Sequence, residues 1–158
     1  MDAITRPVGD SSRFFEDFFV GETIVTQGRT ITETDGSLWA MFTGDMNPMH
    51  VDDDYAAEFG VFGGRFPPGL MAVAIASGLK ERLGLFQGTG LAMLEQTIRY
   101  HSPVLFGDTI RVTLIVEDAT RQPGKRRGIV DFSYALHKGD DTLALDGIWR
   151  MLIAARGD

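Results

Sequence analysis

The chain contains no cysteine among its 158 residues, and this absence excludes disulfide bonds, thiolate metal ligands and a cysteine nucleophile. It also has no apolar run that approaches the length of a membrane span. The opening stretch, MDAITRPVGDSSRFFEDF, lacks the charged and apolar regions of a secretory signal peptide. We therefore expect a cytoplasmic protein that does not associate with membranes.

Positive charge is in the minority, because 15 Lys and Arg stand against 22 Asp and Glu, giving a net charge of −7. This excess of negative charge repels a phosphate backbone, so we expect no nucleic-acid partner. The one basic cluster, Lys125 to Arg127, follows a Pro-Gly pair and is interpreted as a solvated hairpin loop. Attraction for a nucleotide phosphate is the alternative interpretation, although nothing nearby in the sequence supports it.

The length of the chain suits one domain with a sizeable core. There is no internal repeat, linker or low-complexity stretch. Residues 1–13 are polar and unpatterned, which is typical of a loose N-terminal arm. We expect residues 14–158 to form a single domain.

Two helices and a functional loop are predicted in the first half of the chain. The first helix runs from Thr32, with Asp35 in the capping-box position, to Gly44, and carries an apolar stripe. A long polar segment, residues 45–64, follows it with one short helix over residues 52–59, and ordered loops of this length often carry function. The second helix begins after Pro67-Pro68-Gly69, ends near Leu83 and is apolar nearly all round, which predicts that it is buried.

The rest of the chain reads as strands joined by glycine-rich turns. A short strand covers residues 22–29, and longer ones cover residues 91–100, 110–116, 130–136 and 143–153. Consecutive strands with such turns predict an antiparallel meander. Helices followed by strands indicate the α+β class, in which one central helix is wrapped by a curved antiparallel sheet.

The segment Gly44 to His50 holds a carboxylate, an amide and an imidazole within a few residues. Pro48 stiffens it and restricts Asn47, so Asp45 and His50 can face one small target. Histidine titrates near neutrality and a carboxylate can bind water, so the pair suits proton transfer at a double bond. The alternative is structural: Asp45 caps a turn and His50 bonds to the backbone.

Gly69 is the second candidate because it opens the buried helix. The first N–H groups of a helix lack internal partners, so they can stabilise a carbonyl oxygen that becomes an enolate. A simple helix start after two prolines is the alternative.

We expect no metal site, because no second histidine lies at ligand spacing from His50. His101 and His137 are interpreted as structural or exposed, and Ser77 as a core hydroxyl bonded to the preceding turn of the helix. No nucleophile elbow or phosphate-binding loop is present.

Three stretches resemble the MaoC-like dehydratase family, which includes the (R)-specific enoyl-CoA hydratases. They are FTGDMNPMHVD at residues 42–52, Pro68-Gly69-Leu70 with Ala-Ser-Gly-Leu at residues 76–79, and PVLFGD at residues 103–108. They occur in family order and extend the resemblance over about residues 14–155, so the combination is specific.

The resemblance implies a hot-dog fold and a hydro-lyase that hydrates 2-enoyl thioesters to (R)-3-hydroxyacyl thioesters, or dehydrates them. It implies Asp45 and His50 as the catalytic pair, with Gly69, Asn47 and Ser77 in substrate binding and oxyanion stabilisation. No metal or redox cofactor is implied, since the CoA thioester is the substrate. The implied assembly is a homodimer or a higher homo-oligomer.

One position departs from the family pattern, because Pro68 stands where a histidine is usual, and this puts the choice of substrate in doubt. Two other functions fit the same fold. One is a hot-dog acyl-CoA thioesterase, although such enzymes usually lack the Asp-x4-His loop. The other is a non-catalytic subunit that binds acyl thioesters, which the intact Asp45, Asn47 and His50 disfavour.

Overall fold

The computed structural model describes residues 9–156, and the strands of this part of the chain form one seven-stranded antiparallel sheet. The strands are ordered β1-β5-β6-β7-β3, with β2 also paired to β5 and β4 to β7. Their bounds are β1 (Thr23–Val25), β2 (Arg29–Thr30), β3 (Gly90–Gln96), β4 (Arg99–Tyr100), β5 (Thr109–Arg121), β6 (Arg127–Lys138) and β7 (Leu143–Ala154). Because β5, β6 and β7 pair in sequence order, the predicted meander is confirmed for these three strands. The strand expected over residues 91–100 is not part of it, because β3 and β4 pair with β7 and not with β5, the next strand in the chain.

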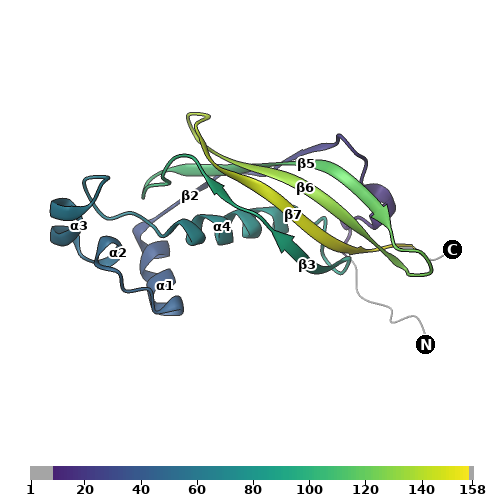
Figure 1. The fold of residues 1–158 in the computed structure, drawn as a ribbon, viewed down its shortest axis with the longest axis horizontal. Coiled ribbons are helices and arrows are strands. Elements are labelled where there is room, and N and C mark those ends of the chain that lie inside the picture. The colour runs from purple at the N-terminus through teal and green to yellow at the C-terminus, as the bar shows by residue number, and fades with distance from the viewer. Residues whose placement is uncertain (1–8, 157–158) are drawn as a thin grey trace.

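The helices divide into one that lies on the sheet and a group that extends beyond it. They are η1 (Phe15–Asp17), α1 (Glu33–Thr43), α2 (Pro48–Val51), α3 (Asp53–Phe59) and α4 (Gly69–Glu81). Figure 1 shows α4 running along one face of the curved sheet, with α1, α2 and α3 gathered past one end of it. None of the helices in residues 9–156 is long and apolar enough to cross a membrane.

The core lies between α4 and the inner face of the sheet. Alternate residues of β5, β6 and the second half of β7 are buried there, and the rings of Tyr134 and Trp149 stack with their centroids 4.1 Å apart. The helix contributes the apolar side chains Met71, Ala72, Val73, Ala76 and Leu79. This arrangement confirms the α+β class and the central helix wrapped by an antiparallel sheet.

Local signals explain where α1 begins and ends. The Thr32 side chain accepts a hydrogen bond from the Asp35 backbone N–H, and the Asp35 carboxylate accepts one from the Thr32 N–H in return. At the other end Gly44 has φ 75, the left-handed conformation that glycine adopts without strain. Both ends of the predicted helix are therefore confirmed.

Two predicted strands are each interrupted in the structure. The strand expected over residues 22–29 is split into β1 and β2, and that over residues 91–100 is split into β3 and β4. The second break occurs where the Thr97 backbone approaches β7 so closely that a Cβ on Gly147 would overlap its carbonyl oxygen. The predicted apolar stripe of α1 is also not buried within the chain, because Phe42 is 88% exposed and Met41 is 74% exposed.

Most of the predicted N-terminal arm, residues 1–8, lies outside the described residues. Of the remainder, Arg13 donates its backbone N–H to the Leu85 carbonyl at 2.8 Å. The Ser12 hydroxyl donates to the Gln87 carbonyl at 2.6 Å. Residues 12 and 13 thus run beside the turn that follows α4.

Candidate functional site

The loop between α1 and α2 fixes the candidate carboxylate. The Asn47 side chain caps α2 by accepting a hydrogen bond from the Met49 N–H at 3.1 Å. The Asn47 N–H in turn donates to Asp45 Oδ1 at 3.4 Å. Because Pro48 occupies the first turn of α2 and fixes its own φ, the loop is stiff and Asp45 is held partly buried.

His50, on α2, is oriented by the segment that precedes α4. Its Nδ1 lies 2.7 Å from the Phe66 carbonyl oxygen, and the two rings meet edge to face at 5.0 Å. A carbonyl oxygen only accepts hydrogen bonds, so Nδ1 carries the proton. The other nitrogen, Nε2, is thereby left to accept or deliver a proton.

Gly69 begins α4, and its preceding residue, Pro68, provides no side-chain cap. The Met71 N–H donates to the Pro68 carbonyl at 2.9 Å, whereas the Gly69 N–H has no acceptor within residues 9–156. The ring of Tyr100 lies directly on this glycine, since a Cβ placed there would be 2.8 Å from Tyr100 Cε1. A glycine is needed at this position because the close approach of the Tyr100 ring leaves no room for a side chain.

Two adjoining cavities meet at this point. The first, which we call the Asp–His cavity, is about 640 Å³ and is lined by Trp39, Thr43, Asp45, Asn47, Met49, His50, Phe66, Pro68, Gly69, Leu70 and Tyr100. The second, the apolar cavity, is about 420 Å³ and is lined by Phe62, Phe66, Pro67, Pro68, Gly69, Ala72, Tyr100, His101, Ser102, Pro103, Val104 and Leu145. The boundary that they share consists of Phe66, Pro68, Gly69 and Tyr100.

The structure thus brings together four of the five candidate residues, Asp45, Asn47, His50 and Gly69, around the Asp–His cavity. The fifth, Ser77, lies about two turns farther along α4 and lines neither of the two cavities. Pro68, the departure from the family pattern, lines both of them. No cluster of three or more side chains able to hold a metal occurs within residues 9–156.

Two features of this region cannot be predicted from neighbouring residues in the sequence. The sequence predicts Tyr100 only as the end of a strand, yet it lines both cavities, and burial raises the pKa of its phenol. His101 has no acidic residue close to it in the sequence, but in the structure its Nε2 lies 2.9 Å from Asp146 Oδ2 on β7. The pairing is long-range in sequence, so no local pattern could reveal it.

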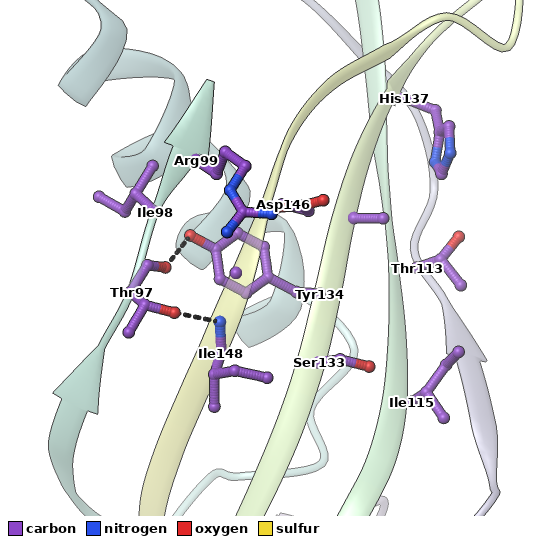
Figure 2. A pocket seen from close by; sticks show the side chains of 12 residues that line it. Thr97, Ile98, Arg99, Thr113, Ile115, Ser133, Tyr134, His137, Asp146 and Ile148 are labelled. Atoms are coloured by element: carbon purple, nitrogen blue, oxygen red, sulfur yellow. Dashed lines mark hydrogen bonds between the residues drawn. The ribbon is translucent and has the colours of Figure 1, made fainter. Parts of the chain in front are cut away.

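A third cavity of about 590 Å³ lies on the outer face of the sheet, away from α4 (Figure 2). Its floor includes Thr113 and Ser133, which alternate with core residues along β5 and β6. At its edge the Tyr134 hydroxyl donates to the Thr97 carbonyl at 3.0 Å, and the Thr97 hydroxyl accepts from the Ile148 N–H at 2.9 Å. None of the candidate residues lines this cavity.

Comparison with known proteins gives a consistent result. Residues 16–135 match the family model described as MaoC like domain. The chain is 35% identical over 104 residues to an (R)-specific enoyl-CoA hydratase of Rhodospirillum rubrum, covering 65% of this chain and 69% of that protein. It is 33% identical over 135 residues to a 3-hydroxybutyryl-CoA dehydratase of Methylorubrum extorquens, covering 85% and 80%.

Solved structures agree on the fold. The crystal structure of an Archaeoglobus protein named a monoamine oxidase regulatory protein aligns with a TM-score of 0.85 and 26% identity, covering 96% of this chain and all of that one. A Mycobacterium tuberculosis protein with a double hot-dog fold aligns with a TM-score of 0.78 over 96% of this chain and 47% of that one. At 18% identity the second likeness concerns the fold alone, and it confirms the hot-dog arrangement.

Proposed function

The chain belongs to the MaoC-like dehydratase family and is an enzyme of the hydro-lyase class, and from this premise we propose that it hydrates 2-enoyl thioesters of the acyl-CoA type. The product is the (R)-3-hydroxyacyl thioester, and the reverse dehydration uses the same groups. The observation that carries the proposal is the cavity in which Asp45 and His50 face the beginning of α4. We propose that no metal or redox cofactor takes part.

The Asp–His cavity supplies what the hydration step needs. One water is held between the Asp45 carboxylate and His50 Nε2. One of the two groups removes a proton from this water as the water oxygen bonds to C3 of the substrate. The C2=C3 π electrons move toward the thioester oxygen, which becomes an enolate, and the same proton is then delivered to C2 as the carbonyl re-forms.

The backbone at Gly69 and the amide of Asn47 support this step in different ways. The Gly69 N–H donates to the thioester oxygen, and one such donor typically stabilises the transition state by about 3 kcal/mol. Asn47 holds the loop by capping α2, so it acts on Asp45 through the backbone. A role for Ser77 stays a prediction, because Ser77 lines neither cavity.

We further propose that the working form is a homodimer or a higher homo-oligomer. Within residues 9–156, edge strand β3 is paired on one side only, and its Leu94 and Met93 are 48% and 39% exposed. Such an edge is a template for pairing with another chain. Light scattering at micromolar concentration measures the mass, and a monomer of 17.4 kDa would contradict the proposal.

The test of the function is the loss of enoyl absorbance when the protein is mixed with crotonyl-CoA. We expect rapid loss with the wild type and none with Asp45→Asn or His50→Ala. His137→Ala is the matched control. This variant should keep full activity, because His137 lines the third cavity, on the outer face of the sheet. If neither crotonyl-CoA nor longer or branched enoyl thioesters are hydrated and free thiol is released instead, the protein is a thioesterase and not a hydratase. Tight binding with no reaction would indicate a non-catalytic subunit.

A further inference from the structure

Resting on the proposed function, we propose that Tyr100 is a further catalytic residue. Its phenol O–H donates a second hydrogen bond, beside that of the Gly69 N–H, to the thioester oxygen as this oxygen becomes an enolate. The candidate is not one that the sequence motifs contain, because Tyr100 lies about 30 residues after the helix glycine, at the end of β4.

The backbone and the ring contacts place the phenol at the beginning of α4. Tyr100 pairs with Leu145 of β7, so its backbone is fixed by the sheet. A Cβ on Gly69 would lie 2.8 Å from Cε1, 3.1 Å from Cζ and 3.3 Å from the hydroxyl oxygen of Tyr100. The hydroxyl is therefore beside the first residue of the helix, whose N–H has no acceptor in the part of the chain that the structure describes.

The same position is where the reacting carbons must lie. Asp45 and His50 line one cavity, and the neighbouring cavity is predominantly apolar and suits the hydrocarbon part of an acyl group. C1 to C3 of the substrate therefore sit near the shared boundary. Of the four boundary residues, Phe66, Pro68 and Gly69 have no polar side-chain atom, so the Tyr100 hydroxyl is the one polar group that a side chain brings there.

The hydroxyl is available as a donor. Within residues 9–156 no side chain or carbonyl accepts from it, whereas the Tyr134 hydroxyl is already bonded to the Thr97 carbonyl. Tyr100 is also half-exposed, at 51%, so a bound ligand can reach it. Because burial raises the pKa of Tyr100 above the ordinary tyrosine value, the phenol stays protonated at neutral pH and can donate.

A second donor has most effect on the reaction itself. Hydrogen bonds to an anionic oxygen are stronger than those to a neutral carbonyl, so the phenol stabilises the enolate-like transition state more than the bound substrate. Its contribution is thus expected in kcat rather than in substrate affinity. This expectation separates a catalytic phenol from an aromatic ring that only packs.

The experiment compares Tyr100→Phe with the wild type. Phenylalanine keeps the ring on Gly69 and removes only the hydroxyl, so the fold is preserved. We expect kcat/KM for crotonyl-CoA to fall about ten- to hundredfold, through kcat. The dissociation constant of butyryl-CoA, a saturated thioester with the same carbonyl group, should change by less than about threefold. Tyr134→Phe is the matched control, since it removes a hydroxyl that lines neither catalytic cavity, and its kcat/KM should stay at the wild-type value.

Two outcomes would overturn the proposal while leaving the proposed function intact. In the first, the wild type hydrates crotonyl-CoA and Tyr100→Phe does so within about twofold of the same rate. In the second, butyryl-CoA binding weakens as much as kcat/KM falls, which makes the phenol a ground-state contact. A wild-type chain that hydrates no enoyl thioester would overturn the proposed function, and the role of Tyr100 with it.

Discussion

The Nδ1 atom of His50 lies 2.7 Å from the Phe66 carbonyl oxygen, and this contact determines which nitrogen of the imidazole is free. The bond joins α2 to the segment before α4, so it connects the segment that carries Asp45 and His50 to the central helix. It also separates the two roles of the ring, because Nδ1 fixes the orientation and Nε2 remains for chemistry.

Replacing His50 by Asn should separate these two roles. The asparagine amide N–H can take the place of Nδ1 and keep the bond to Phe66, but nothing takes the place of Nε2. We expect hydratase activity to fall about 10²- to 10⁴-fold, while the unfolding midpoint in urea stays near the wild-type value. An active variant would show that Nε2 is not required.

Gly69→Ala should lower both stability and activity, because the new Cβ would lie 2.8 Å from the Tyr100 ring. Gly78→Ala is the matched control on the same helix, since nothing lies within 4 Å of its Cβ position. Alanine is the better helix former, so Gly78→Ala should raise the free energy of unfolding by about 0.5–1 kcal/mol. Equal effects of the two substitutions in chemical denaturation would contradict the packing that we describe.

Gly147→Ala should destabilise the fold by about 2–3 kcal/mol, because its Cβ would overlap the Thr97 carbonyl oxygen. Gly139→Ala serves for comparison, since the nearest atom to its Cβ position is 3.8 Å away. We expect that control to remain within about 0.5 kcal/mol of the wild type. Thermal unfolding followed by circular dichroism measures the stability of both variants. A Gly147→Ala variant as stable as the wild type would show that the Thr97 backbone, between β3 and β4, does not pack tightly on Gly147.

Acid should destabilise the chain partly through Asp17. The Arg156 guanidinium, which bonds both carboxylate oxygens at 2.7 and 2.6 Å, holds the pKa of Asp17 below its ordinary value. The pair therefore stabilises the folded state at pH values above about 4 and loses this contribution as pH falls through the lowered pKa.

Asp17→Asn should accordingly show a smaller loss of unfolding free energy than the wild type between pH 5 and about pH 2. Arg156→Gln removes the largest cause of the lowered pKa and should reduce the pH dependence by a smaller amount, because the Phe14 N–H still donates to Asp17 Oδ2 at 2.9 Å. Urea titrations over this range test the pair. A variant with the full wild-type slope would exclude Asp17 as a source of acid sensitivity.

Sequence patterns predicted the parts of the fold that depend on neighbouring residues. The ends of α1 follow from Thr32, Asp35 and Gly44. The strands β5 and β6 follow from the alternation of apolar and polar residues, and β7 follows from a longer, more continuously apolar run. The loop carrying Asp45, Asn47 and His50 was also found, because its candidate residues lie within one short stretch.

The remainder depends on contacts between distant segments. The short helix α2 was not predicted, although Asn47 and Pro48 are its N-cap and first residue. Lys80 is only 3% exposed, and its ammonium lies 2.7 Å from Glu81 and 4.8 Å from the centre of the Phe86 ring, which no helical periodicity indicates. Tyr100 reaches the site only because β4 pairs with β7 beside the beginning of α4.

Phe66 serves two purposes at once, and this has a consequence for how the enzyme would respond to different acyl groups. Its side chain lines both cavities, while its carbonyl holds the His50 ring. An acyl group too bulky for the apolar cavity must push against the residue that aims the imidazole. A poor substrate would therefore still bind, but the misaligned imidazole would transfer the proton slowly. Such a substrate would act as a competitive inhibitor of a good one.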